Sequence, residues 1–238
     1  MHACAELEPA LKGVSFATGA GEKIGIVGRT GAGKTTLAVA LFRITELSSG
    51  RVILDGIDVS KIGLDDLRTH IAIIPQDPVL FAGTIRSNLD PFSSYGDYEL
   101  ESALDKVHMR DFVRSQKDKL NYEVSEGGSN LSVGQRQLLC MARALLRKAK
   151  VIVMDEATAS VDMETDGLIQ ATIREQFHSS TVLTIAHRLA TVMACDRVMV
   201  LGDGRVLEMG EPKALSEDPA TIFHEMTSSR SSAEEMLK

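Results

Sequence analysis

Short apolar runs alternate with glycine turns through the first third of the chain, a pattern typical of buried strands in an α/β fold. The run at 23–27 predicts such a strand, and a glycine-rich loop follows it. An amphipathic helix is predicted next, over 34–43. Further strands are predicted over 52–54 and 71–74, with the turn residues Asp55-Gly56 between them.

The spacing of apolar residues changes in the middle of the chain. Apolar positions at helical intervals among charges over 97–119 predict a helical subdomain. Ser132 lies where an N-cap belongs, ahead of a second long helix predicted over 135–147. Continuous apolar or β-branched runs at 151–154 and 181–185 predict strands buried on both faces of a parallel sheet.

A hairpin is predicted near the C-terminal end of the chain. Its strands at 197–201 and 205–208 flank the turn Gly202-Asp203-Gly204. The serines and charges after Thr227 predict a frayed tail over 228–238.

Composition limits the possible functions. The 238 residues are 44% hydrophobic, enough to bury a sizeable core, and the formal net charge of −7 argues against wrapping duplex DNA. Three cysteines without metal-ligand spacing fit a reducing compartment better than a disulfide framework. Because no apolar run approaches the ~18 residues of a membrane span and the start does not fit a signal peptide, the chain itself is expected to be soluble.

A glycine-rich octet between the first predicted strand and helix fits the phosphate-binding pattern G-x-x-x-x-G-K-[ST]. Its glycines let backbone N–H groups surround a β-phosphate, and the helix N-terminus adds its dipole. Lys34 is expected to neutralise the β- and γ-oxygens, and Thr35 to give Mg²⁺ a hydroxyl ligand. The alternative, a plain glycine turn, is disfavoured by this context. The residues expected to bind nucleotide here are Gly28, Arg29, Thr30, Gly31, Ala32, Gly33, Lys34, Thr35 and Thr36.

Two acids end the predicted strand at 151–154. The carboxyl end of a strand is where an α/β sheet presents its ligand site, so Asp155 is expected to hold Mg²⁺ directly or through water. Glu156 points differently and is expected to polarise a water for attack on the γ-phosphate. The alternative is a helix N-terminus decorated with acids, which the helix dipole favours. Few apolar strands end in adjacent acids without a cation nearby, which favours the metal site.

A second anion site is predicted at the start of the later helix. The hydroxyl of Ser132, the backbone of Gly134 and the helix N-terminus at Gln135 together offer donors to a phosphate. The run Leu131-Ser132-Val133-Gly134-Gln135, placed upstream of Asp155-Glu156, closely resembles the signature motif of the ABC ATPase family. In that family two domains pair head to tail, and each signature caps the nucleotide on the partner's phosphate loop.

Other motifs match the same family in order, and the resemblance covers about 11–225. Gln76 resembles the Q-loop glutamine, which ligands Mg²⁺ or water and couples to transmembrane domains. Ser160-Val161-Asp162 resembles the D-loop. His187 resembles the switch histidine that contacts the γ-phosphate, although taken alone it would more often be structural.

Within the family, the chain resembles the C-terminal nucleotide-binding domain of the C subfamily, the multidrug-resistance-protein type. The runs that carry this resemblance are 75–81, 84–91 and 125–137. The two halves of that subfamily are unequal. The resemblance therefore implies that this half supplies the phosphate loop and the glutamate of the competent site, with the other half's signature completing it.

The resemblance implies an α/β fold of the P-loop NTPase (RecA-like) type: a mostly parallel sheet with helices on both faces, an antiparallel N-terminal β-region and an inserted helical subdomain. It implies ATP and Mg²⁺ as cofactors, with Glu156, His187 and Gln76 as catalytic residues. The expected parts of this single ABC ATPase domain, 1–238, are a core at 1–78 and 143–227, the helical subdomain at 79–142 and the tail at 228–238. The implied metal ligands are Thr35, Gln76 and Asp155.

The implied partners are the transmembrane domains of the transporter and a second nucleotide-binding domain, and no nucleic acid. The implied location is the cytoplasmic face of a membrane. Two departures from the family stand out. The aromatic residue that stacks on adenine is missing near Ala3, and Val133 replaces the more common signature glycine.

The sequence can be compared with four alternatives to an ATPase that powers transport. A regulatory nucleotide sensor beside a channel would keep Lys34, Asp155 and Glu156, so sequence separates it poorly. A soluble ABC ATPase acting on nucleic acid or ribosomes is disfavoured by the acidic balance and the lack of a basic face. The sequence lacks the Asn-Lys-x-Asp motif with which a GTPase reads the base. Neither a GTPase nor a small-molecule kinase has a role for the signature helix.

Overall fold

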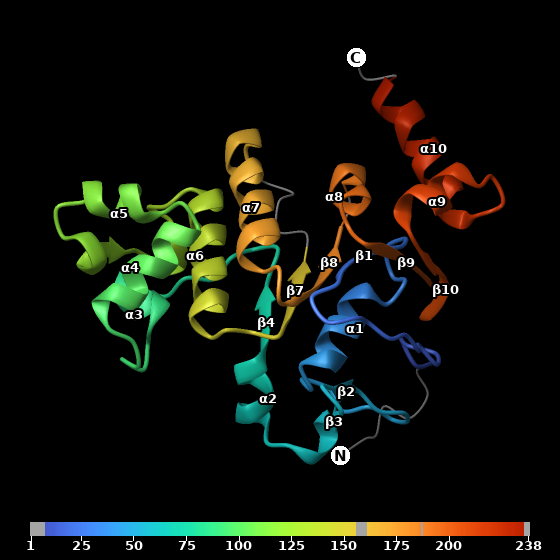
Figure 1. The fold of residues 1–238 in the computed structure, drawn as a ribbon, viewed down its shortest axis with the longest axis horizontal. Coiled ribbons are helices and arrows are strands. Elements are labelled where there is room, and N and C mark those ends of the chain that lie inside the picture. The colour runs from blue at the N-terminus through green and yellow to red at the C-terminus, as the bar shows by residue number, and fades with distance from the viewer. Residues whose placement is uncertain (1–7, 156–160, 187, 236–238) are drawn as a thin grey trace. The chain divides into compact units, whose positions relative to one another are not determined.

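The chain folds into two compact units, seen as a computed structural model in Figure 1. The boundary between the units crosses strand β8 (Thr181–Ile185) and helix α2 (Leu64–His70). The first unit comprises 1–18, 23–67 and 183–238, and the second comprises 19–22 and 68–182. The structure describes residues 8–155, 161–186 and 188–235, the last of these without the side chains of 229–235.

The first unit contains the strand and helix that enclose the phosphate-binding loop. Its sheet order is β10-β9-β1-β8, in which β1 and β9 pair in parallel and β9 and β10 pair antiparallel. Its elements are β1 (Lys23–Val27), α1 (Lys34–Leu41), β2 (Ile53–Leu54), β3 (Ile57–Asp58), a 3-10 turn (Val59–Lys61), α8 (Leu189–Met193), β9 (Arg197–Gly202), β10 (Arg205–Gly210), α9 (Pro212–Glu217) and α10 (Ile222–Glu235).

Apolar side chains from strands and helices form the core of this unit. They come from β1, β9, α8, α10 and the residue that follows β8, and they are Val27, Ala186, Val192, Val198, Val200 and Phe223. The strand predicted at 23–27 and the hairpin predicted around 202–204 are both confirmed. Helix α10 extends over 228–235, where the sequence predicts a frayed tail.

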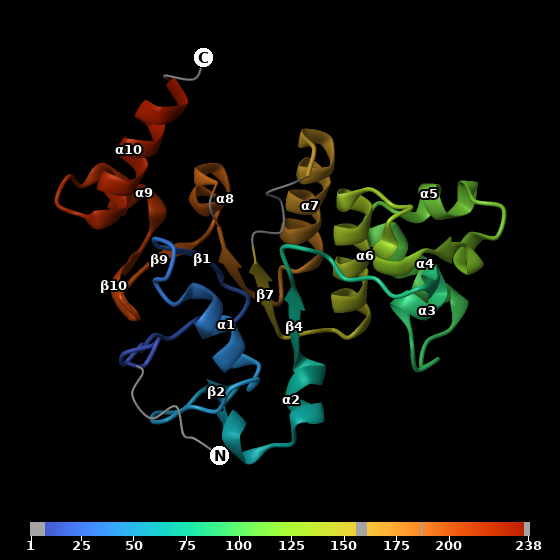
Figure 2. The same ribbon diagram turned by 180° about the vertical axis from the view of Figure 1, so that it is seen from behind.

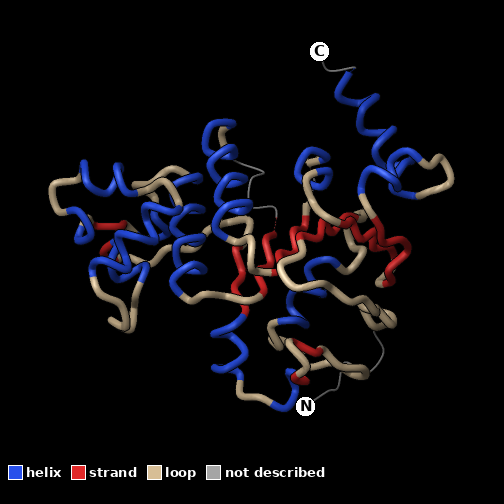
Figure 3. Tube along the Cα trace, viewed as in Figure 1, coloured by secondary structure: helices blue, strands red, loops and turns tan. Residues whose placement is uncertain are grey.

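The second unit is rich in helices, which Figure 3 shows in blue beside the red strands. Its sheet order is β8-β7-β4, and β4 and β7 pair in parallel from Ile71↔Val151 to Ile74↔Met154. Its elements are β4 (Ile71–Ile74), β5 (Gly83–Thr84), α3 (Ile85–Leu89), α4 (Asp97–Lys106), α5 (Arg110–Ser115), 3-10 turns (Lys119–Asn121 and Glu126–Gly128), β6 (Glu123–Val124), α6 (Val133–Leu146), β7 (Val151–Asp155) and α7 (Met163–Gln176).

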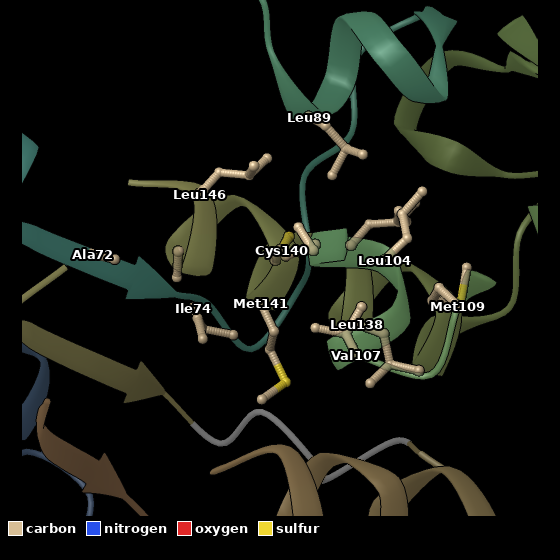
Figure 4. Packing of buried hydrophobic residues seen from close by; sticks show 14 of the residues in the cluster. Ala72, Ile74, Leu89, Leu104, Val107, Met109, Leu138, Cys140, Met141 and Leu146 are labelled. Atoms are coloured by element: carbon tan, nitrogen blue, oxygen red, sulfur yellow. The ribbon is translucent and has the colours of Figure 1, made fainter. Parts of the chain in front are cut away.

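Helix α6 is the centre of the second unit's core. It packs against α3, α4, α7 and β4, and the group α3 to α6 is also visible from behind in Figure 2. Figure 4 shows α6 side chains such as Leu138 and Met141 between those of β4 and those of α4. Leu139, Met141 and their neighbours have almost no exposed surface, and burial of their apolar area stabilises the packing of α6 in the unit.

The helices α3 to α6 lie where a helical subdomain is predicted, inside the second unit. Helix α7 is absent from the sequence-based prediction, whereas the strands predicted at 71–74, 151–154 and 181–185 are all present. Within the described residues, no helix has the length and apolar character needed to cross a bilayer.

Candidate functional site

The phosphate-binding loop runs from the end of β1 to the start of α1 in the first unit (Figure 1). Lys34, the first residue of α1, is 8% exposed. Its Nζ donates hydrogen bonds to the carbonyl oxygens of Gly28 at 2.8 Å and Arg29 at 3.1 Å. The ammonium group is therefore held against the backbone of the loop by two charge-assisted hydrogen bonds.

Gly33 sets the direction in which helix α1 leaves the loop. Its φ of 101° is left-handed, and an added Cβ would lie 3.0 Å from Leu11 Cδ2 and 3.1 Å from the Ala10 oxygen. As the N-cap it has no side chain to satisfy the first N–H groups of α1. Those donors and the helix dipole can therefore act on an anion.

The turn of the β9–β10 hairpin supports the loop from one side. The N–H of Gly204 donates to the Ala32 oxygen at 3.1 Å, and an added Cβ on Gly28 would collide with the Leu201 oxygen. A cavity of about 640 Å³ borders the loop on this side. Its lining residues are Gly28, Arg29, Thr30, Gly31, Ala32, Val200, Leu201, Gly202, Asp203, Leu207, Ile222, Glu225 and Met226.

Two candidate metal ligands lie at adjoining strand ends in the second unit. Strands β4 and β7 run in parallel with Ile74 opposite Met154, so Pro75 and Asp155 follow side by side. Asp155 is the half-buried last residue of β7, and Gln76 is exposed one residue beyond Pro75. Both residues thus follow the carboxyl ends of parallel strands, and their role as metal ligands stays a prediction.

The signature segment starts helix α6 with a capping box. Ser132 Oγ accepts from the Gln135 N–H at 3.1 Å, and Gln135 Oε1 accepts from the Ser132 N–H at 2.9 Å. The predicted N-cap is confirmed, and the helix begins at Val133. Gly134 lies so close to Thr165 of α7 that an added Cβ would collide with its side chain. The missing side chain thus lets α6 and α7 approach closely.

Asp162, from the predicted D-loop, caps the start of helix α7. Its carboxylate accepts from the Thr165 N–H at 2.9 Å, and this hydrogen bond lowers the pKa of Asp162. Among the predicted site residues, Glu156, Ser160 and His187 lie outside the described residues, as does Ala3 in the expected adenine-stacking region.

Side-chain bonds from α6 to the chain around Gln76 were not predicted from sequence. Gln137 Nε2 donates to the Pro75 oxygen at 3.1 Å, and Arg143 donates to the Val79 oxygen at 2.9 Å. These bonds join residues 62 and 64 positions apart. The hint in the sequence is that Gln137 directly precedes the apolar run 138–142 of this helix.

The predicted site residues are divided between the two units. The loop residues, from Gly28 to Thr36, belong to the first unit, and Gln76, Ser132, Gly134, Gln135 and Asp155 belong to the second. Within the described residues, no cluster of three or more histidine, cysteine or acidic side chains could hold a metal ion.

A family model described as "ABC transporter" matches residues 11–159. The chain belongs to the ABC transporter family. This ABC transporter chain is 54% identical over 218 residues to human ATP-binding cassette sub-family C member 2, covering 92% of the chain and 14% of that protein. It is 56% identical over 220 residues to multidrug resistance protein mrp-7 of Caenorhabditis elegans, again covering 92% of the chain and 14% of that protein.

A third relative, ABC transporter C family member 3 of Dictyostelium discoideum, is 55% identical over 218 residues, covering 92% of the chain and 15% of that protein. The ABC transporter chain therefore spans only 14% to 15% of the length of these relatives. The predicted likeness to C-subfamily nucleotide-binding domains is confirmed.

A solved structure, "Structure of a bacterial Atm1-family ABC exporter with ATP bound", also matches the ABC transporter chain. The TM-score is 0.86 and the sequences are 34% identical. The match covers 93% of the chain described here and 39% of the exporter chain. The predicted P-loop NTPase fold, with a mostly parallel sheet and surrounding helices, is confirmed.

Proposed function

We propose that this chain binds and hydrolyses ATP to power the transport of a substrate across a membrane, as the C-terminal nucleotide-binding domain of a C-subfamily ABC transporter. The observation that carries the proposal is the phosphate-binding loop, with the Lys34 ammonium held against the loop backbone and a helix starting directly behind it. The chain's 54% sequence identity to a sub-family C protein, over 92% of its length, supports the assignment to that subfamily.

In this proposal the loop binds the phosphates of ATP. Backbone N–H groups of the loop and of the first turn of α1 point at the β-phosphate, and Lys34 exchanges its backbone acceptors for phosphate oxygens. The exchange costs little because both the carbonyl contacts and the phosphate contacts satisfy the same three ammonium protons.

The proposed Mg²⁺ ligands suit the ion chemically. Mg²⁺ prefers oxygen donors, and Thr35, Gln76 and Asp155 offer a hydroxyl, an amide carbonyl and a carboxylate. The parallel register of β4 and β7, which puts Asp155 beside Pro75, supports a shared role for two of them. When bound, the ion would neutralise negative charge on the β- and γ-oxygens.

Hydrolysis is assigned to Glu156 and His187, which lie outside the described residues. Glu156, directly after β7, would orient the attacking water and accept its proton, and His187 would contact the γ-phosphate. Because phosphoryl transfer needs positioning and charge stabilisation more than covalent help, these few groups suffice.

A second copy of the fold would complete the site. The start of α6, with Ser132, Gly134 and Gln135, is proposed to cap the nucleotide held by a partner nucleotide-binding domain paired head to tail. The Ser132 hydroxyl and the N-terminus of α6 can donate hydrogen bonds to an anion, in addition to the donors of the chain's own phosphate-binding loop. The transmembrane domains are proposed to lie near Gln76, where Val79 is 55% exposed and Phe81 is 69% exposed.

The proposed location is the cytoplasmic face of a membrane. Nucleic acid is excluded as a partner in this proposal because the net charge of −7 would repel it. A nucleotide-sensing role beside a channel is the alternative that ATP binding alone would not exclude.

ATP affinity of Lys34→Ala tests the proposal. Loss of a charged hydrogen-bond donor to phosphate should weaken binding roughly ten- to hundredfold, as measured with a fluorescent ATP analogue. Lys61→Ala, an exposed lysine of the same unit, is the matched control and should bind as the unaltered chain does. Equal ATP affinity of Lys34→Ala and the unaltered chain would refute nucleotide binding at this loop.

A further inference from the structure

Two side chains of α6 hold the chain on either side of Gln76. Gln137 donates its amide to the Pro75 oxygen at 3.1 Å, and Arg143 Nη1 donates to the Val79 oxygen at 2.9 Å. Gln76 itself is exposed between these two attachment points. Helix α6, which Ser132 caps, is thereby tied to both ends of the segment 75–79.

Gln137 is an unusual residue at its position. It is 0% exposed, and because a carbonyl can only accept, the contact with Pro75 fixes which end of the amide faces it. The other end, Oε1, is buried and has no hydrogen-bond partner among the described residues. A buried acceptor without a partner lowers stability, so an apolar side chain of the same size would be preferred if packing alone mattered.

Arg143 provides the second attachment. Its guanidinium also donates to the main-chain oxygen of Asn88 at 2.6 Å and to Asn88 Oδ1 at 2.7 Å. Asn88 in turn binds the backbone of Phe81 in both directions, at 2.9 Å and 2.8 Å. The chain that follows Gln76 is therefore fixed to α6 by a connected set of hydrogen bonds, which the planar fork of arginine can make and lysine cannot.

The pairing of β4 with β7 links the bonds from α6 to the position of Gln76. Pro75 adjoins Asp155 at the ends of β4 and β7, so a shift of Pro75 moves Gln76 relative to that carboxylate. A displacement of α6 along its axis would pull on Pro75 and Val79 together, because both are bonded to the same helix.

We propose that Gln137 and Arg143 are positioning residues, which place Gln76 according to where helix α6 lies. A nucleotide bound at the start of α6 would thus be coupled to Gln76 through the helix itself. The inference rests on the proposed function, since it assigns Gln76 a part in ATP hydrolysis. Neither positioning residue touches the nucleotide.

The first test is Gln137→Met in the full-length protein in lipid vesicles, with Leu138→Met as the matched control. Both variants put methionine at a buried position of α6, but only the first removes the bond to Pro75. We expect kcat for ATP hydrolysis to fall roughly tenfold in Gln137→Met, with KM for ATP little changed. Leu138→Met should keep both parameters.

A readout independent of turnover is the hydrogen exchange of backbone amides over 76–81. Exchange there should rise in Gln137→Met and stay unchanged in Leu138→Met, because only the former frees Pro75 from α6. Equal exchange in both variants would contradict the attachment.

A double-mutant cycle separates positioning from a structural role. If Gln137 acts through Gln76, Gln137→Met should add little to the loss of kcat already caused by Gln76→Ala. Fully multiplicative losses would overturn the inference. Should Gln137→Met fail to fold, Arg143→Lys takes its place in the same cycle and is judged by the same criterion.

The outcomes also distinguish this inference from the proposed function. An unaltered protein without Mg²⁺-dependent ATP hydrolysis would refute the proposed function. Normal hydrolysis in the unaltered protein together with full kcat in Gln137→Met and Arg143→Lys would overturn only the positioning role.

Discussion

Single residues around the phosphate-binding loop have little conformational freedom. Gly33 combines a left-handed φ of 101° with close neighbours, and Lys34 is bonded to the oxygens of Gly28 and Arg29. A loop fixed in this way loses little further entropy when a phosphate enters. Its shape is therefore set before the ligand arrives.

Gly33→Ala should therefore destabilise the fold and weaken ATP binding. The left-handed backbone costs an alanine about 1 kcal/mol, and the approach to Leu11 Cδ2 at 3.0 Å adds to it. Gly50→Ala is the control, because its φ of 82° is also left-handed but nothing lies within 4 Å of the added Cβ. Urea unfolding should show a larger loss for Gly33→Ala, and equal losses would mean that the neighbours yield freely.

The thiol of Cys195 should resist alkylation in the folded chain. Burial raises its pKa from 9.0 to about 12, so at pH 8 it carries about a thousandfold less thiolate than an ordinary cysteine. Mass spectrometry of the iodoacetamide-treated chain should show slow labelling when native and fast labelling when unfolded. Fast native labelling would contradict the burial.

The raised pKa of Cys195 should also make the stability of the fold depend on pH. The thiol of the unfolded chain ionises first, so the free energy of unfolding should fall as the pH rises from about 9 towards 12. Cys195→Ser should remove that part of the pH dependence in urea titrations, and an unchanged dependence would assign it to other groups.

At the scale of elements, helix α6 combines a capping box at its start with a fully buried face. Ser132→Ala should lower the free energy of unfolding by about 1 kcal/mol, because the Gln135 N–H loses its acceptor. Ser48→Ala, at an exposed position outside any helix, should leave it unchanged. Equal urea midpoints for the two variants would mean that the cap contributes nothing to stability.

Local signals explain which elements could be predicted. The loop from Gly28 to Thr35 has its own spacing, Ser132 is a strong N-cap, and the turn at 202–204 is rich in glycine, so each is visible within a few residues. Helix α7 was missed because its apolar stripe is weak: Gly167 interrupts it, and Met163 is 93% exposed.

Long-range contacts could not be predicted in the same way. The bonds from Gln137 to Pro75 and from Arg143 to Val79 depend on how α6 packs against β4 and α3, which no local pattern encodes. At the end of the chain, serines and charges predict a frayed tail over residues at which α10 extends to Glu235.

At the scale of the whole molecule, the chain covers 14% to 15% of its sub-family C relatives. The phosphate-binding loop and the signature helix belong to different units of the chain. A head-to-tail pair would bring one domain's signature to the other's loop, so we expect the isolated chain to hydrolyse ATP only as far as it pairs.

The most direct test of ATP hydrolysis by this domain is its Mg²⁺-dependent rate as a function of protein concentration, with Glu156→Gln as the control and ATP binding measured in parallel. We predict that the specific rate climbs with concentration, or appears when the other nucleotide-binding half is added. It should vanish in Glu156→Gln, which should still bind ATP. A Glu156→Gln variant as active as the unaltered chain, or ATP binding without turnover even with the other half present, would contradict the account.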